Sequence, residues 1–142
     1  MGLNLQILKI SANDTDLLES FIDALGNEQI SFRYFKNRST KVLENHVYTC
    51  LAMLNNVPVG YGHLDSEDGV IWLGIVVKEE YQGKGIAKRI MGHLLQAAKS
   101  LDLSEIQLAV DNVNHNALKL YERFGFGLVS KSAEYSILTK KL

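Results

Sequence analysis

Hydrophobic and polar residues first alternate and then follow a helical period in the N-terminal part of the chain. Residues 5–10 alternate as in a half-buried strand. Residues 13–16, Asn-Asp-Thr-Asp, supply cap residues and early negative charge for a helix that ends at Gly26. Residues 27–46 fit a helix or a loop. The start of the chain therefore predicts a strand followed by a helix.

From residue 47 onward the pattern predicts strands first, and then strands alternating with helices. Two apolar runs separated by Asn55-Asn56 are typical of a β-hairpin, and a strongly apolar third strand follows. The predicted strands are residues 47–54, 57–64, 70–77, 106–110, 126–131 and 135–139, and the predicted helices are residues 85–101 and 114–124. This order favours a mixed sheet with helices on both faces. A ligand site is expected where the third of these strands ends in a Gly-rich turn.

Length and charge are those of one ordinary globular domain. The 142 residues suit a single domain over residues 1–142 with a proper core. The 15 Lys and Arg residues nearly balance the 16 Asp and Glu residues, so a broad surface for nucleic acid is not indicated. No apolar run approaches the ~20 residues that span a bilayer, and the N-terminus lacks the features of a signal peptide. We therefore expect a soluble, cytoplasmic protein that binds neither nucleic acid nor membrane.

Cys50 is the only cysteine, which excludes an intrachain disulfide. It lies in an apolar run, and no histidine stands at a catalytic or metal-ligand spacing from it. This context favours a small buried hydrophobic residue over a reactive thiol.

The Gly-rich segment Gln82-Gly83-Lys84-Gly85-Ile86-Ala87-Lys88 joins the strand at 70–77 to a long amphipathic helix. Glycine lets a backbone approach a ligand closely, and the first N–H groups of a helix can hold phosphate oxygens. The segment lacks the Gly-Lys-Ser/Thr of a Walker loop, and Lys88 takes the third glycine position of the dinucleotide fingerprint. From the residues alone, an anion-binding turn and a turn without a ligand both remain open.

A second motif extends through the last predicted helix. It reads Asn114-His115-Asn116-Ala117-Leu118-Lys119-Leu120-Tyr121-Glu122-Arg123-Phe124-Gly125-Phe126. With the Gly-rich segment before it and a strand between the two, the chain resembles the GNAT superfamily of acetyl-CoA-dependent N-acetyltransferases, from about residue 58 to the C-terminus. The resemblance implies an α/β fold with a twisted, mixed and mostly antiparallel sheet of six to seven strands and about four flanking helices.

The resemblance also implies acetyl-CoA as the co-substrate, without a metal ion. Its pyrophosphate is expected on the backbone of the Gly-rich turn. Its pantetheine arm is expected in a gap where the preceding strand splays away from its neighbour. The residues that the resemblance assigns to the cofactor are Ile75, Val77, Gln82, Gly83, Lys84, Gly85, Ile86, Ala87, Lys88 and Asn114. Core packing for Ile75 and Val77, and a helix N-cap for Asn114, suit the same positions.

Tyr121 is the catalytic residue that the resemblance implies, as the acid that protonates the departing CoA thiolate. From the residues alone, a tyrosine packed on the apolar face of its helix is favoured. The strand at 70–77 carries no acid that could serve as a base. His63 and Asp65 lie two residues apart and therefore on one strand face, where His63 could be the base and Asp65 could orient it. A structural histidine is the alternative.

Residues 32–38 are rich in aromatic and positively charged side chains, which suit a sugar or base ring and a phosphate or carboxylate. Arg33, Tyr34 and Phe35, together with Asp65, are the candidate acceptor-binding residues. An amphipathic helix with a solvated basic face is the alternative. This segment, together with Tyr61-Gly62-His63-Leu64-Asp65, is faintly similar to bacterial acetyltransferases that act on amino sugars.

The expected function is transfer of an acetyl group from acetyl-CoA to a primary amine of a small molecule, for example an amino sugar or a nucleotide-linked amino sugar. Two alternatives remain open: an inactive acyl-CoA-binding regulatory module, and an acetyltransferase of protein or peptide amines. Since dimers are common in the family, the resemblance also allows a homodimer.

Overall fold

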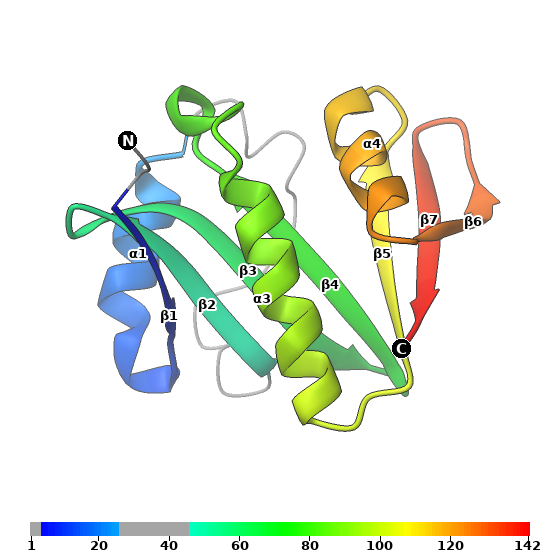
Figure 1. The fold of residues 1–142 in the computed structure, drawn as a ribbon, viewed down its shortest axis with the longest axis horizontal. Coiled ribbons are helices and arrows are strands. Elements are labelled where there is room, and N and C mark those ends of the chain that lie inside the picture. Colours follow the sequence, from blue (N-terminus) through cyan, green and yellow to red (C-terminus); the bar gives the residue numbers. More distant parts are fainter. Residues whose placement is uncertain (1–3, 26–45) are drawn as a thin grey trace.

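Seven strands form one mixed sheet in the computed structural model, which describes residues 4–25 and 46–142 (Figure 1). The strands lie in the order β1-β2-β3-β4-β5-β7-β6, and among these described strands only the β4–β5 pair is parallel. The strands are β1 (Leu5–Lys9), β2 (His46–Leu54), β3 (Val57–Glu67), β4 (Val70–Val77), β5 (Glu105–Asp111), β6 (Gly127–Lys131) and β7 (Tyr135–Lys141). The prediction of a mixed, mostly antiparallel sheet of six to seven strands is confirmed.

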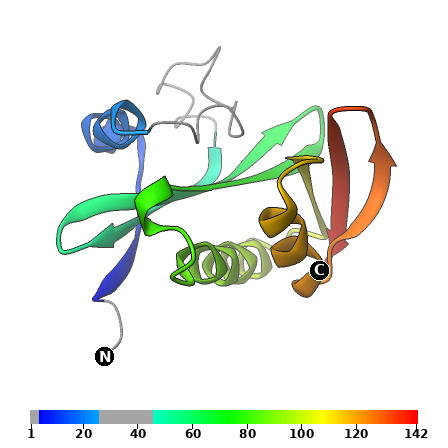
Figure 2. The same cartoon turned by 90° about the horizontal axis from the view of Figure 1, so that it is seen from above.

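Helices cover both faces of the sheet. Figure 2 shows α1 on one face, and α3 and α4 side by side on the other. The described helices are α1 (Thr15–Asp23), α3 (Ile86–Ser100) and α4 (His115–Arg123), with the 3₁₀ turns η1 (Ala12–Asp14) and η3 (Glu79–Tyr81). All three α-helices lie where the sequence predicts them: α3 and α4 agree within one residue at each end, and α1 ends at Asp23, three residues before the predicted end at Gly26.

Two tight turns connect β2, β3 and β4 into a meander. Asn55 and Asn56 have φ of 51° and 67°, and Asp68 and Gly69 have φ of 53° and 80°. Two consecutive left-handed residues match the twist of the strands that they join. The predicted hairpin is confirmed, although β3 runs further than predicted, to Glu67.

The core has one layer on each side of the sheet, because both sheet faces carry helices. On the α1 face, Phe21 stacks on the ring of Tyr61 with centroids 6.3 Å apart. The buried residues of this layer are Ile10, Leu18, Phe21, Leu51, Met53, Tyr61 and Val76. The layer under α3 and α4 is larger and includes Cys50, Leu64, Leu73, Ile86, Ile90, Leu94, Leu108 and Tyr121.

Cys50 is fully buried in the layer under α3. Burial raises the pKa of its thiol to about 12. The thiolate, which is the reactive form, is therefore scarce at neutral pH. The prediction that Cys50 is a buried hydrophobic residue is confirmed. In the described part of the chain, no helix has the length and apolar character needed to cross a bilayer.

Two glycines of β3 let α3 pack closely on the sheet. A Cβ atom added at Gly62 would lie 2.6 Å from Cγ2 of Ile90 and 2.9 Å from Cδ1 of Leu94. At Gly60 the same Ile90 side chain would be 2.9 Å away. All three distances are shorter than two non-bonded carbon atoms tolerate, so a side chain at either glycine would force α3 or its side chains to shift.

We expect Gly62→Ala to destabilise the protein by about 1–3 kcal/mol, because the added methyl group overpacks the contact with α3. The measurement is the free energy of unfolding from urea denaturation. Gly92→Ala is the matched control, since a Cβ there meets nothing within 4 Å. A helical Gly→Ala change is expected to stabilise by roughly 0.5–1 kcal/mol. Equal stability of the Gly62→Ala variant and the wild type would contradict the close packing.

Candidate active site

Strands β4 and β5 begin side by side and then separate. Only one residue pair joins them in the described register, Trp72 with Gln107, near the start of each strand. Figure 1 shows the two strands meeting at this end and diverging toward the other, where β4 leads to α3 and β5 leads to α4. The expected splay of the strand before the Gly-rich turn is confirmed.

The backbone of β4 points into the gap that the splay creates. Hydrogen-bonded and non-bonded residue pairs alternate along an antiparallel ladder. The Lys78 N–H donates to the Val59 carbonyl at 2.9 Å, so Val77, one residue earlier, belongs to a non-bonded pair with β3. The same alternation places Ile75 in a non-bonded pair. The N–H and C=O groups of Ile75 and Val77 therefore point away from β3, toward the gap.

The Gly-rich turn closes one end of this gap. Gly83 and Gly85 have φ of 78° and 81°, and a Cβ added at either would meet nothing within 4 Å. The side-chain amide of Gln82 donates to the carbonyl of Val77 at 3.0 Å, which ties the turn to the end of β4. Gly85 is the N-cap of α3 and provides no side-chain cap. The first N–H groups of α3 are thus available to an anion.

Positive charge and backbone groups around the turn fit a diphosphate. Lys84 and Lys88 are exposed, and Nζ of Lys84 lies 5.8 Å from the ring centre of Tyr81. Ile86 is buried and Ala87 half-buried, so their side chains serve the core and only their backbone can face a ligand. An open, uncapped helix start without Cβ atoms in the way therefore matches the pyrophosphate of acetyl-CoA.

Tyr121 lies near the C-terminal end of α4, on the face of the sheet that α3 covers. Its ring meets the edge of Phe126 with centroids 6.0 Å apart. Burial raises the pKa of Tyr121 to about 12. Its hydroxyl makes no hydrogen bond to the residues that the structure describes, where every fully buried polar side-chain atom has a partner. The hydroxyl therefore keeps contact with accessible space and is available as a donor.

Asn114 caps α4, as its residue type predicts. The Asn114 side-chain oxygen accepts from the Ala117 N–H at 3.3 Å. This bond fixes the start of the helix that carries Tyr121. Binding of the cofactor by Asn114 stays a prediction.

His63 lies on the opposite face of the sheet from Tyr121, in β3. It is only 2% exposed, and its Nδ1 is 2.7 Å from the hydroxyl of Tyr61. Asp65 is also buried and follows on the same face, as the spacing predicts. The register partner of His63 in β4 is Gly74. Because Gly74 has no side chain, none stands on β4 between His63 and the gap.

Two residues beside His63, His46 and Tyr61, were not predicted as site residues from the sequence. The ring centroid of His46 lies 4.9 Å from that of His63. His46 was not foreseen because it lies at the end of a segment that fits helix or loop, and because a register shift between His46 and Tyr48 sets its direction. Tyr61 could have been found, since it stands two residues before His63 on the same strand face.

The structure places Ile75 and Val77 beside the gap and residues 82–88 in the turn that follows β4, with Tyr121 and His63 on opposite faces of the sheet. Arg33, Tyr34 and Phe35 lie outside the described residues. Across residues 4–25 and 46–142, no group of His, Cys, Asp and Glu side chains has the arrangement of a metal site.

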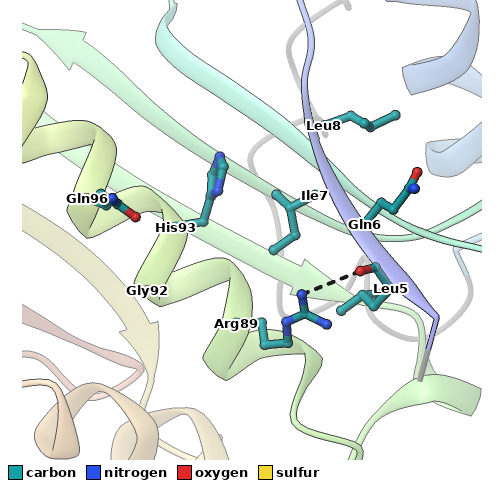
Figure 3. Close-up of a pocket in the computed structure, with 8 residues that line it drawn as sticks. All are labelled: Leu5, Gln6, Ile7, Leu8, Arg89, Gly92, His93 and Gln96. Atoms are coloured by element: carbon teal, nitrogen blue, oxygen red, sulfur yellow. Dashed lines mark hydrogen bonds between the residues drawn. The ribbon is translucent and has the colours of Figure 1, made fainter. Parts of the chain in front are cut away.

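An open groove of about 620 Å³ lies between β1 and α3 (Figure 3). The guanidinium of Arg89 reaches across it to the carbonyl of Leu5 at 3.4 Å. The lining residues are Leu5, Gln6, Ile7, Leu8, Arg89, Gly92, His93 and Gln96. None of the residues predicted for the acetyl-CoA site is among them, so this groove is separate from the gap between β4 and β5.

Solved structures share this fold. A GNAT-family acetyltransferase from Streptococcus pneumoniae superposes with a TM-score of 0.77 at 20% identity, covering 98% of this chain and 100% of that one. The PaiA N-acetyltransferase from Thermoplasma acidophilum, in complex with coenzyme A, gives 0.76 at 19% identity over 99% and 100%. At these identities the likeness shows the fold alone, which is that of the GNAT acetyltransferases.

The sequence shows the family as well. Residues 14–126 match the model of the acetyltransferase (GNAT) family, and the chain belongs to this family. A spermine/spermidine N(1)-acetyltransferase from Bacillus subtilis is 38% identical over 64 residues. That match covers 44% of this chain and 42% of the relative, so it spans less than half of either protein.

Proposed function

We propose that this protein transfers an acetyl group from acetyl-CoA to a primary amine of a small molecule. The observation that carries the proposal is the row of backbone groups of Ile75 and Val77 that face the gap. The Val77 carbonyl accepts from the Gln82 side chain, and the other backbone groups of Ile75 and Val77 that face the gap need partners, which an amide-containing arm laid between the strands would supply. The uncapped start of α3 would be the adjoining phosphate site.

The roles of the residues follow from this placement. Residues 82–88 would hold the pyrophosphate through their backbone, with Lys84 and Lys88 adding positive charge. Ile75 and Val77 would bind the pantetheine amides, and Asn114 would border the same site. Acetyl-CoA supplies an activated acetyl thioester when bound.

Tyr121 and His63 lie on opposite faces of the sheet, which would allow them to act as acid and base from different sides. From the α1 face, His63 would take a proton from the attacking amine. From the α4 side, Tyr121 would donate a proton to the sulfur of the departing thiolate. This division needs no movement of a proton across the sheet, and holding both reactants in the gap contributes to the rate.

The acceptor class rests on two indications. The Bacillus subtilis relative is named for spermine and spermidine, which favours a polyamine, although its match covers less than half of each chain. The aromatic and basic residues 32–38 favour an amino sugar, and they lie outside the described residues. Both classes carry primary amines. The cytoplasmic location, the single domain over residues 1–142 and a homodimer stay predictions from the sequence.

The test is CoA release from acetyl-CoA against a panel of polyamines, amino sugars, nucleotide-linked amino sugars, amino acids and peptides. A thiol reagent can measure the released CoA, because Cys50 is buried and its pKa is raised to about 12, so its thiol is not expected to react with the reagent. We expect turnover with a polyamine or an amino sugar. Turnover with peptides alone would indicate that the acceptors are protein or peptide amines. Tight CoA binding without any turnover would support an acyl-CoA-binding module instead.

A further inference from the structure

Strand β1 is one edge of the sheet, and alternate residues of it turn their backbone groups away from β2. The strand order places β1 last, with β2 as its neighbour (Figure 1). The Ile10 N–H donates to the Thr49 carbonyl at 2.9 Å, and the register of β1 on β2 continues up to this bond without a shift. Because bonded and non-bonded pairs alternate along an antiparallel ladder, the N–H and C=O groups of Leu5, Ile7 and Lys9 point outward.

Arg89 of α3 already uses one of these outward groups. Its guanidinium donates to the Leu5 carbonyl at 3.4 Å, across the open groove of about 620 Å³ that Figure 3 shows. This bond is independent evidence that the Leu5 carbonyl faces outward. Within residues 4–25 and 46–142, the outward groups of Ile7 and Lys9 have no hydrogen-bond partner. Unpaired N–H and C=O groups along a strand edge are a template for pairing with another extended segment.

The opposite wall of the groove leaves room for such a segment. Gly92 of α3 lines the groove and is exposed, and a Cβ added there would meet nothing within 4 Å. The next residue, His93, is fixed by its Nε2, which lies 2.7 Å from the Tyr48 hydroxyl and so ties α3 to β2. The groove therefore has a held wall on the α3 side and open space beside β1.

The charge of the two walls favours an acidic segment. Strand β1 and helix α3 together carry Lys9, Lys88, Arg89 and Lys99, and neither element contains an Asp or Glu residue. In the part of the chain that the structure describes, none of these four side chains forms an ion pair. The Arg89 guanidinium has five N–H donors and one hydrogen bond to the described residues, so donors remain for a carboxylate. A second copy of β1 would bring the same positive charges together, which disfavours self-pairing.

We propose that the groove between β1 and α3 binds an extended acidic segment of a partner protein, which pairs with β1 as an additional edge strand and places a carboxylate on Arg89. The backbone of the segment would bond the outward groups of Ile7 and Lys9, and Arg89 stands at the end of that row, on the Leu5 carbonyl. Every second side chain of the segment would share one face, so acidic residues at alternate positions would face the same wall. The residues of the proposed acetyl-CoA site take no part, so the inference does not depend on the proposed function.

The first experiment measures pairing at the edge directly. The probe is a pool of capped hexapeptides with Glu or Asp at alternate positions and Val, Ile, Thr or Tyr between them, added at about 1 mM to the ¹⁵N-labelled full chain. We expect the amide hydrogen exchange of Ile7 and Lys9 to slow about tenfold, and that of Gln6 and Leu8, which already bond β2, to stay unchanged. A pool with Lys and Arg in place of the acids is the control. Unchanged exchange with the acidic pool, or equal slowing with the basic pool, would overturn the proposal.

Two pairs of variants separate strand pairing from attraction between charges, with an acidic peptide from the pool as the probe. Arg89→Glu should weaken peptide binding at least about tenfold, whereas Lys99→Glu, the same change of charge outside the groove, should bind as the wild type. Lys9→Pro removes the outward N–H, and Lys9→Ala removes the same charge but keeps the N–H. We expect about tenfold weaker binding by Lys9→Pro than by Lys9→Ala. Circular dichroism checks that each variant is folded, and equal binding within either pair would overturn the proposal.

Other occupants of the edge would give different results. Slower exchange of Ile7 and Lys9 at higher protein concentration, without any peptide, would show that a second copy of the chain takes the edge. Glutarate that binds as tightly as the acidic peptides, and leaves the exchange of both amides unchanged, would show a site for small carboxylates. Either result would overturn the proposal of an added strand from a partner.

Discussion

Gly85→Glu is expected to weaken the binding of CoA by about 100-fold, or about 2.7 kcal/mol, while the protein stays folded. Gly85 precedes the first residue of α3 in a left-handed conformation, and a Cβ there would point into open space. The new side chain would put bulk and a negative charge where the pyrophosphate is expected. Isothermal titration calorimetry with CoA measures the loss.

Gly69→Glu is the control for this change. Gly69 has φ of 80°, against 81° for Gly85, and a Cβ there also meets nothing within 4 Å. Both variants therefore place a non-glycine residue in a left-handed backbone conformation, which costs roughly 1–2 kcal/mol in each. Gly69 lies in the turn before β4, whereas Gly85 follows the turn after it, so only Gly85 borders the proposed site. An equal loss of CoA affinity in both variants, or no loss in Gly85→Glu, would contradict a phosphate site at the start of α3.

The order and type of the elements could be predicted because the signals are local. The Asn55-Asn56 turn needs left-handed residues, and asparagine adopts this conformation more readily than most residues. The apolar stripes of α3 and α4 repeat at the helical period. The two motifs likewise placed the turn at residues 82–88 and Tyr121 through a family resemblance, which the match over residues 14–126 supports.

The parts of the site that depend on pairing between strands could not be predicted from local pattern. The direction of the Ile75 and Val77 backbone groups follows from which ladder pairs are bonded, and the sequence does not encode that in any local way. The approach of His46 to His63 needs the pairing of β2 with β3 and the register shift after His46. The shared face of Tyr61, His63 and Asp65 could be predicted, because alternation along a strand requires it.

Tyr121→Phe is expected to lower kcat about 100-fold and to leave the affinity for acetyl-CoA unchanged. The phenylalanine ring keeps the contact with Phe126, whose centroid lies 6.0 Å from that of Tyr121, so the helix and the gap should stay in place. The change removes only the hydroxyl group, and with it the proton that would be donated to the thiolate. Single-turnover kinetics and CoA titration measure the two quantities. Tyr135→Phe, at a residue 46% exposed in β7, is the control and should behave as the wild type.

The raised pKa of Tyr121 suits the role of acid better than a comparison with free thiols suggests. A free thiol has a pKa of about 8.5, so a phenol with a pKa of about 12 would be a poor donor to its thiolate in water. Burial, however, raises the pKa of a thiol as well: Cys50, in the same core layer, has its pKa raised to about 12. A CoA thiolate that departs into surroundings of low polarity would likewise bind a proton more tightly than a thiolate in water, which favours proton transfer from Tyr121.

The raised pKa of Tyr121 also sets the expected pH dependence of kcat. Since burial disfavours the ionised phenol, the folded enzyme keeps the Tyr121 proton until the pH approaches about 12. We therefore expect kcat to show no alkaline decline from this residue across the range in which the protein is folded. Unchanged turnover of Tyr121→Phe would rule out the role of acid. A decline of kcat with a midpoint near the ordinary tyrosine pKa of about 10, lost in Tyr121→Phe, would show instead that the hydroxyl is solvated in the working enzyme.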